Sequence, residues 1–467
     1  MSDRHHAVVV GGSLAGLAAA SALARHFRRV TIVERDALPD DASARAGTPQ
    51  ARHVHVLLAR GRRELEQLFP GFERLLLSRG AVELDYGWTF AVLRQHGWQR
   101  RQPFGITGLF QSRALLESVV RELARRIPNL ELRERTEVVR LVADTRPARR
   151  VSGLVVRSRG GSGDDHVAAD LIVDASGRSS KVTSWLADLG LECPQEVVVD
   201  SDGGYSTRWY RAPAAERWPE AWWWKGIWID PELPDGRIAG VLSPVEGDRW
   251  IVTLGGLEGH YPPTDEVGFD DFLRRLRSPL LAQAVALGEP ISPVYGHRAM
   301  ANRFRHFERW RARLGGFVAL GDSVCAFNPV YGQGMTAAAV SARLLDDWIA
   351  RAGASGPLVP SDYFRAQARF LREVWDLATG ADFRLPKTTG PRPRFAHLAN
   401  GYLDMLLLAA EEDPRVRTAM LDVVHLLDSP TVLFRPAVVA RVLGHRLRQR
   451  TEVGSAARAA IPALPAG

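Results

Sequence analysis

The first 36 residues of the chain alternate between two short apolar runs and an alanine-rich segment that separates them. The runs HHAVVV (5–10) and RRVTIVERD (28–36) are rich in β-branched residues, which is typical of buried strands. The segment SLAGLAAASALARHF (13–27) combines alanine and leucine with little bulk, which is typical of a helix packed closely on a sheet. This order predicts a βαβ unit, and therefore a parallel sheet flanked by helices.

The turn GGSLAG (11–16) follows the G-x-G-x-x-G pattern of dinucleotide-binding folds, with Ser13 in place of the middle glycine. A serine is small enough to let a pyrophosphate approach the backbone, and the start of the helix offers free N–H groups. Glu34 ends the second strand where a ribose-binding acid is expected, and its charge excludes a 2′-phosphate. We therefore expect the turn to bind FAD or NAD. The residues expected to contact it are Gly11, Gly12, Ser13, Leu14, Ala15, Gly16, Glu34 and Arg35.

The composition excludes several other classes of protein. The net charge of +8 is carried almost entirely by arginines that alternate with apolar residues, which favours solvated faces over a nucleic-acid patch. No apolar run approaches the roughly 20 residues of a membrane span. The first residues lead directly into a strand, so we expect no signal peptide. Cys193 and Cys325 lack the spacing of metal ligands. We expect a cytoplasmic protein without a metal, a membrane span or a nucleic-acid partner.

A second glycine-rich stretch decides between the two nucleotides. FVALGD (317–322) is typical of a buried strand that ends in an acid, NPVYGQGM (328–335) of a turn, and TAAAVSARLLDDWI (336–349) of a helix. With the first motif, this stretch resembles the second FAD fingerprint of the class A FAD-dependent monooxygenases, the para-hydroxybenzoate hydroxylase-like superfamily. The resemblance implies FAD in a Rossmann-like, glutathione-reductase-type α/β domain, with Asp322 hydrogen-bonded to the ribityl chain. It places near the flavin ring Gly332, Gln333, Gly334 and Met335.

Further segments fit the same family. FQSRALLESVV (110–120) begins a helix at Arg113, which matches an arginine that reaches the cofactor in relatives. RTEVVRLVAD (135–144) and HVAADLIVDASG (166–177) are expected strands, and the resemblance brings the backbone of Val138 to the adenine.

The segment DASG (174–177) occupies the place of the family's middle Asp-Gly pair. Here Ser176 replaces the aspartate and only Gly177 is kept. In relatives this pair is linked to pyrophosphate and pyridine-nucleotide handling. We therefore expect electrons from NADPH or NADH, with a separate flavin reductase as an open alternative to direct transfer.

The loop RAGTPQARHVHVLLARGRRELEQLFPG (45–71) narrows the resemblance to one branch. It is similar to a loop of bacterial FAD epoxidases that act on polyketide olefins, relatives of squalene epoxidase. The resemblance implies that Arg45 contacts the cofactor and that Gln50, His53 and His55 lie near the flavin. The two histidines also fit a loop in which they only make hydrogen bonds.

This branch implies a flavin C4a-hydroperoxide as oxidant, with molecular oxygen and a lipophilic natural-product intermediate as reactants. The expected outcome is epoxidation or hydroxylation in a dry, shaped pocket, and no side chain is a certain catalyst. The residues expected at the flavin face are Pro329, Tyr331 and Gly332. The residues expected in the substrate pocket are His53, His55, Trp224, Trp228 and Asn328.

The tryptophan-rich segment WPEAWWWKGIWID (218–230) suggests a halogenase instead. Flavin halogenases carry a W-x-W-x-I-P signature and a catalytic lysine, but here the spacing differs and the proline is absent. A flavin-dependent reductase or desaturase of prenyl-type substrates also fits the sequence, as does a flavin-retaining protein that shields a reactive product.

The chain is expected to fold as an FAD domain, an antiparallel-sheet substrate domain and a C-terminal helical region. The helical region either closes over the pocket or serves as a packing brace. The expected boundaries are 1–80, 105–190 and 296–350 for the FAD domain, 81–104 and 191–295 for the substrate domain, 351–450 for the helices, and 451–467 for a loose tail.

Overall fold

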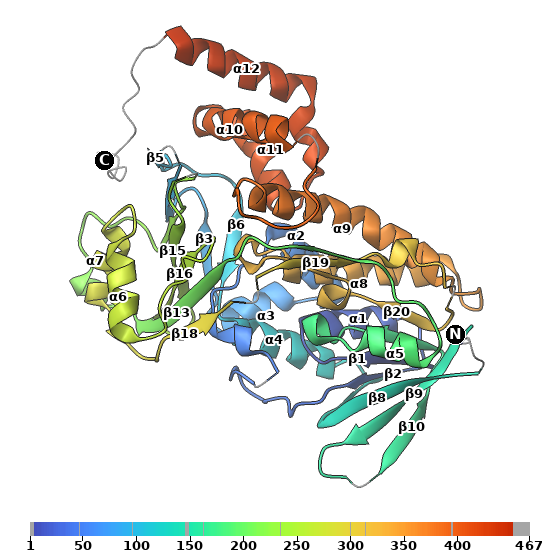
Figure 1. Ribbon diagram of the computed structural model, residues 1–467. Helices are drawn as coiled ribbons and strands as arrows, with labels where there is room; N and C mark the ends of the chain where they lie inside the picture. Colours follow the sequence, from blue (N-terminus) through green and yellow to red (C-terminus); the bar gives the residue numbers. More distant parts are fainter. Residues whose placement is uncertain are drawn as a thin grey trace.

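The computed structural model describes residues 4–451 except 46, 96, 145–148, 162, 234, 299, 313, 394 and 395, and without the side chains of 215, 396–400 and 448–451. Its central element is a parallel sheet (Figure 1). The strand order is β20 (Phe317–Ala319), β11 (Leu171–Asp174), β1 (His6–Val10), β2 (Arg29–Val33) and β7 (Leu130–Arg133). The βαβ unit is present, because α1 (Leu14–Ala24) connects the neighbouring parallel strands β1 and β2.

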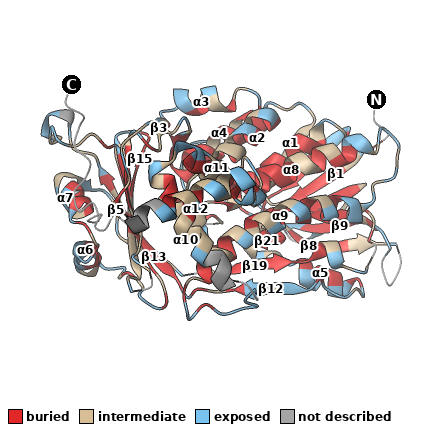
Figure 2. Ribbon diagram, turned by 90° about the horizontal axis from the view of Figure 1, so that it is seen from above, coloured by how far each residue is buried: buried red, intermediate tan, exposed pale blue. Residues whose placement is uncertain are grey.

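Small residues allow two helices to lie close together against this sheet. Helix α1 contacts α8 (Gly334–Arg351), and alanines such as Ala19 and Ala339 in these helices are fully buried. Figure 2 shows the buried residues along both helices. The other helices of this part are α2 (Ala59–Leu68), α3 (Phe72–Ser78), α4 (Arg113–Arg125) and α5 (Val182–Asp188).

The segment 166–177, expected as one strand, is divided between two sheets. Strand β10 (Asp164–Ala168) pairs with β9 (Val151–Ser158), which pairs with β8 (Thr136–Ala143), whereas β11 joins the parallel sheet. The break falls at Asp170, whose carboxylate accepts hydrogen bonds from the backbone N–H groups of His5 and His6. The remaining small sheets comprise β3 (Val82–Asp85) with β6 (Thr107–Phe110), and β12 (Glu196–Val199), β19 (Asn302–Arg305) and β21 (Cys325–Ala326).

A large sheet stands beside the parallel one (Figure 1). Its neighbouring strands are antiparallel except for the parallel pair β4 and β14. One face packs against α6 (Glu266–Arg274) and α7 (Leu280–Leu287) around an apolar core. The strand order is β17 (Glu289–Pro290), β13 (Gly204–Arg211), β16 (Arg249–Gly256), β15 (Ile238–Val245), β14 (Gly226–Ile229), β4 (Phe90–Arg94) and β5 (Gly97–Trp98), with β18 (Tyr295–His297) paired to β13.

The C-terminal part is helical, as expected. It comprises α9 (Pro360–Asp382), α10 (Ala396–Glu412), α11 (Pro414–Val424) and α12 (Pro436–Thr451). Of the expected tail, residues 452–467 lie outside the described residues. The predicted fold class is confirmed: a Rossmann-like parallel core, antiparallel sheets and C-terminal helices. In the described part of the chain, none of the helices has the length and apolar character needed to cross a membrane.

Candidate cofactor and active site

The two glycine-rich motifs meet in space, although about 300 residues separate them in the sequence. Gly321 precedes the acid of the second motif, and a Cβ added there would lie 3.0 Å from the Cβ of Ala15 in the first motif. The helix starts that follow the two motifs, at Leu14 in α1 and at Gly334 in α8, therefore belong to one site.

The first motif forms a cradle that side chains would fill. Gly11 has a φ of 104°, in the left-handed region that favours glycine, and a Cβ there would lie 2.7 Å from the carbonyl oxygen of Ala175. A Cβ added to Gly16 would lie only 1.8 Å from the carbonyl oxygen of Gly11. This close approach of backbone to backbone fits a pyrophosphate at the start of α1.

Ser13 is small enough for the turn, and its hydroxyl group also makes hydrogen bonds with charged side chains. Ser13 Oγ donates to Glu117 Oε2 over 2.8 Å and accepts from Arg113 Nη2 over 3.0 Å. Arg113 Nη2 also lies 3.2 Å from Glu117 Oε2. Arg113 Nε is buried and has no hydrogen-bond partner among the described residues. An unpaired buried donor beside the cradle fits an anionic group of FAD.

Arg45 is held at the same place by three carboxylates. Its Nε donates to Glu117 Oε1 over 3.1 Å, its Nη1 donates to Asp36 Oδ2 over 2.8 Å, and Nη1 lies 3.4 Å from Glu34 Oε1. Burial alone would raise the pKa of Glu117, but the facing charges of Arg113 and Arg45 lower it below its usual range. The cluster therefore keeps two buried guanidinium groups at the start of α1.

Glu34, the acid predicted to bind the ribose, is almost fully buried. Its Oε2 accepts from the backbone N–H of Gly12 over 2.7 Å, and its Oε1 accepts from the N–H of Asp36 over 2.9 Å. Arg35 is exposed, away from this cluster. Val138 lies in β8 where the register with β9 shifts, next to the cofactor-side strand β2.

The second motif leaves a carboxylate facing open space. The Asp322 side chain is 40% exposed, and Arg178 Nε lies 3.7 Å from its Oδ2. Among the described residues no donor makes a hydrogen bond to this carboxylate. A Cβ added to Gly334 would lie 3.7 Å from Asp322 Oδ1, so the acid stands at the start of α8. Gly177, the retained glycine of the middle motif, has a φ of 81° and immediately precedes Arg178.

The turn before α8 is fixed by buried amides. Asn328 is fully buried and its Oδ1 accepts from the N–H of Val330, while Gly332 adopts a φ of 65°. Gln333 Oε1 is buried without a partner among the described residues, whereas Pro329 is exposed. This unpaired atom and the free N–H groups that begin α8 fit the polar edge of a flavin.

The loop that contains His53 and His55 lies between the turn and the large sheet. A Cβ added to Gly332 would lie 3.4 Å from Val56 of this loop. His53 Nδ1 and Thr207 Oγ1 share a hydrogen bond of 2.8 Å, and His55 Nδ1 donates to the carbonyl oxygen of His53 over 2.9 Å.

Both histidines are neutral at physiological pH. Burial, followed by the repulsion of His297, lowers the pKa of His53 to about 3, and burial with the charge of Arg113 lowers the pKa of His55 to about 4. Gln50 lies in the same loop and is only half-buried. Neither histidine can supply a proton as an imidazolium near neutral pH.

His53 and His55 form a histidine cluster, and one face of the large sheet begins beside it at Thr207. The strand register aligns Thr207 with Thr253, Thr253 with Val241, and Val241 with Trp228, so all four side chains share a face. Thr253, Val241 and Trp228 are half-buried although they lie on central strands. This face is therefore not fully covered. Trp228 lies three strands from Thr207, which places the two residues about 14 Å apart at the usual spacing between strands.

Trp224, expected in the pocket, lies elsewhere. It is 1% exposed and packs with Trp218 and Trp250 in the core between the large sheet and α6 and α7. The neighbouring Ile227 is in the same core, whereas Trp228 packs on the opposite face against the apolar cluster that includes Phe90 and Phe110. The structure thus places Trp228, but not Trp224, on the face that His53 contacts.

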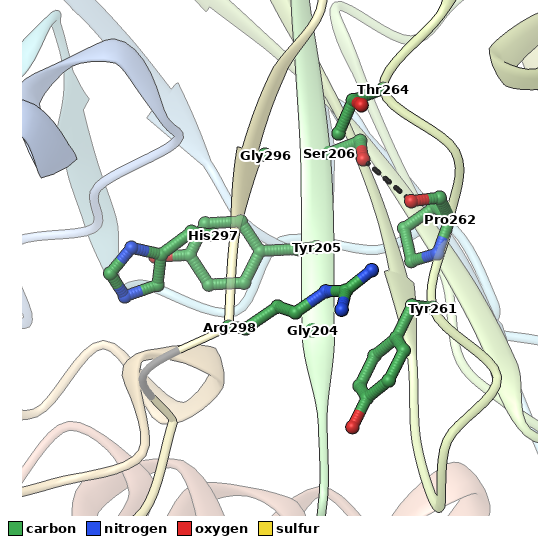
Figure 3. Close-up of a pocket in the computed structure, with 9 residues that line it drawn as sticks. All are labelled: Gly204, Tyr205, Ser206, Tyr261, Pro262, Thr264, Gly296, His297 and Arg298. Atoms are coloured by element: carbon green, nitrogen blue, oxygen red, sulfur yellow. Dashed lines mark hydrogen bonds between the residues drawn. The ribbon is translucent and has the colours of Figure 1, made fainter.

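A pocket of about 430 Å³ lies at the edge of β13 and β18 (Figure 3). In Figure 3 the side chains of Tyr205 and His297 lie on one side of these strands, whereas Tyr261 and Pro262 lie on the other. Tyr205 packs edge-on against His53, with 4.7 Å between ring centroids. Tyr205 is therefore part of the histidine cluster, although the sequence offered no motif that would single it out.

The two members of the Ser13–Glu117 pair are expected to differ in their effect on folding. Ser13→Gly removes one hydrogen bond, worth about 1 kcal/mol, and should keep FAD because glycine suits the turn. Glu117→Gln leaves the buried guanidinium of Arg113 without its paired carboxylate, whereas Arg45 keeps Asp36 and Glu34, and this loss should lower the free energy of unfolding by about 3–5 kcal/mol. Urea unfolding of the two apoproteins measures the difference, and equal losses would contradict this account of the cluster.

Comparisons with known proteins support FAD as the cofactor. A family model described as FAD dependent oxidoreductase matches residues 7–188. The chain is 32% identical over 469 residues to Protein Rv3254 of Mycobacterium tuberculosis (strain ATCC 25618 / H37Rv), a match that covers 96% of this chain and 95% of that protein.

Solved structures share the fold. The flavin-dependent brominase Bmp2 matches with a TM-score of 0.66 and 12% identity, over 96% of this chain and 100% of that one. PqsL, a probable FAD-dependent monooxygenase from Pseudomonas aeruginosa, matches with a TM-score of 0.59 and 18% identity, over 81% and 97%. With a relative that spans nearly the whole chain and a family model that matches the dinucleotide motif, this protein belongs to the FAD dependent oxidoreductase family and is an enzyme.

Proposed function

We propose that the protein is a monooxygenase that uses FAD to epoxidise or hydroxylate a lipophilic small molecule. One oxygen atom of O2 enters the substrate and the other leaves as water, with two electrons and one proton supplied as a hydride from NADPH or NADH and a second proton taken from solvent. A separate flavin reductase is the proposed carrier of these electrons, since Ser176 stands where the family has an aspartate. When bound, FAD supplies the redox chemistry with oxygen.

The observation that carries this proposal is the incompletely covered face of the large sheet beside the cofactor turn. It presents Val241 and Trp228 next to Thr253, which is a surface for an apolar substrate with few polar groups. It begins at His53, whose loop contacts the turn that precedes α8. A substrate that lies along this face is held close to the flavin and away from bulk water.

The residues of this chain have separate tasks in the proposed reaction. Arg45 and Arg113 bind the pyrophosphate, Glu34 binds the ribose, and Asp322 binds the ribityl chain. The N–H groups at the start of α8 hold the flavin ring. The neutral, hydrogen-bonded His53 and His55 wall the pocket and exclude water without transferring protons.

Halogenation is disfavoured by the positions of the lysines. Flavin halogenases resemble this chain in fold, but they rely on a lysine inside the protein. Lysine occurs in this chain only at 181, 225 and 387, and all three residues are exposed.

Incorporation of isotopically labelled O2 tests the proposal. The FAD-loaded enzyme is supplied with NADPH, a flavin reductase and a panel of polyene and polycyclic polyketides, and products are analysed by mass spectrometry. One labelled oxygen atom per product is expected. Reduced or dehydrogenated products without labelled oxygen would support a reductase or desaturase, and bromide-dependent products would support a halogenase.

Removal of either histidine should have a small effect on the oxygenation rate. His53→Ala and His55→Ala are each expected to keep at least about a tenth of that rate, because loss of a general base typically reduces rates by about 10²–10⁴-fold. The measurement is the rate of substrate oxygenation with FAD saturated in each variant. A hundredfold loss with FAD still bound would show that a histidine acts as an acid or base.

A further inference from the structure

A buried carboxylate at the end of α9 gathers the side chains that hold the cofactor turn. Asp382 is 1% exposed and is the last residue of α9. It accepts hydrogen bonds from Asn302 Nδ2 over 2.6 Å, from Tyr331 OH over 2.7 Å, and from Asn328 Nδ2 over 3.1 Å. Asn328 and Tyr331 bracket the exposed Pro329 in the turn that precedes α8.

These three donors divide between the two oxygen atoms of the carboxylate, which also makes a hydrogen bond with the Ser201 side chain. Oδ1 accepts hydrogen bonds from Asn328 and Tyr331, and Oδ2 accepts one from Asn302. Asn302 in turn accepts the backbone N–H of Asn328 at its Oδ1 over 2.7 Å. Because Asn302 and Asn328 are fully buried, a missing partner here could not be replaced by bulk water. The network therefore stabilises this arrangement of the turn.

We propose that Asp382 is a positioning residue for the cofactor, which holds the turn Asn328–Tyr331 against the flavin. Helix α9 is then part of the cofactor site, and it lies outside the matched residues 7–188. The inference rests on the proposed function only in that FAD occupies the site beside this turn.

Asp382→Asn tests the proposal with little change in volume. An amide nitrogen at the Oδ2 position meets the amide nitrogen of Asn302, so two donors face each other and the turn shifts. We expect the dissociation constant for FAD to rise by roughly tenfold or more. The visible spectrum and the midpoint potential of the bound flavin should shift too. Asp376→Asn, at an exposed position on α9, is the matched control and should change none of these quantities.

A charge swap separates positioning from general damage to the fold. In the double variant Asp382→Asn with Asn302→Asp, the new amide donates to the new carboxylate, and the oxygen at Oδ1 still accepts hydrogen bonds from Asn328 and Tyr331. Only the long bond of 3.4 Å from Asn302 to the carbonyl oxygen of Val199 is lost. Affinity, spectrum and potential should return toward the wild-type values. A double variant as impaired as Asp382→Asn would overturn the proposal, as would a single variant whose flavin is unchanged.

FAD binding by the wild-type protein distinguishes failure of the proposed function from failure of the proposed role of Asp382. If the wild-type protein takes up no FAD, the proposed function and this inference both fail. If the wild type holds FAD and Asp382→Asn holds it with the same affinity, spectrum and potential, only the role of Asp382 is refuted.

Discussion

Gly16→Ala is expected to abolish FAD binding, and Gly16→Val to do the same. The added Cβ would lie 1.8 Å from the carbonyl oxygen of Gly11, far inside any real contact, and the opposing atom is backbone that cannot rotate away. Helix α1 must then move off β1, and its N–H groups leave the place where the pyrophosphate binds. The ratio of flavin to protein after purification in excess FAD measures the effect.

A second helical glycine provides the control for this substitution. Gly444 lies in α12, and a Cβ added there would meet nothing within 4 Å. Gly444→Ala should therefore keep FAD and gain roughly 1 kcal/mol of helix propensity. A Gly16→Ala protein with the flavin content of the Gly444→Ala control would show that the first motif does not form the cofactor site.

The sequence predicts those parts of the site whose residues lie close together along the chain. The βαβ unit, the turn around Gly16 and the acid Glu34 follow from one stretch of 36 residues, since period and glycine spacing are local signals. Asp322 follows from a second such stretch. The family resemblance predicts that the two stretches share one site. The close approach of Gly321 to Ala15 agrees with this prediction.

The partners of these residues could not be predicted, because they come from distant elements. Ser13 was expected to need only smallness, yet its hydroxyl bonds Glu117, which is 104 positions away. Asp382 meets Asn302 from 80 positions away. No local pattern marks an acid that will be buried beside a particular arginine or amide. Glu117 offered one weak signal, its place four residues after Arg113 on the same helical face.

The sequence does not show which face of the large sheet meets the cofactor. Alternation in β14 shows that Ile227 and Trp228 point to opposite sides, but not which side meets the cofactor. That choice depends on where α6 and α7 pack, which leaves Trp224 in their core and Trp228 on the other face. A tryptophan-rich segment therefore divides between core and candidate pocket only once the layers are known.

Asp322→Ala is expected to weaken FAD binding by roughly 10- to 150-fold. The carboxylate has no hydrogen bond from donors among the described residues, so it is available to the ribityl hydroxyl groups. One charge-assisted hydrogen bond is worth about 1.5–3 kcal/mol, which gives the expected range. Arg178 keeps its bonds to the carbonyl oxygens of Ala301 and Phe327, so the turn should remain in place. Titration of the apoprotein with FAD, followed by fluorescence quenching, measures the dissociation constant.

The control for Asp322 is an acid of similar exposure on the adjoining helix. The Asp347 side chain is 47% exposed near the C-terminal end of α8, against 40% for Asp322 at its start. Asp347→Ala should leave the FAD dissociation constant unchanged, because the residue is about 13 positions from the helix start, or roughly 20 Å at 1.5 Å per residue. Asp322→Asn should fall between the wild type and Asp322→Ala, since the amide can still accept one hydrogen bond but carries no charge. If Asp322→Ala and Asp347→Ala bind FAD equally tightly, the carboxylate at the start of α8 does not hold the cofactor.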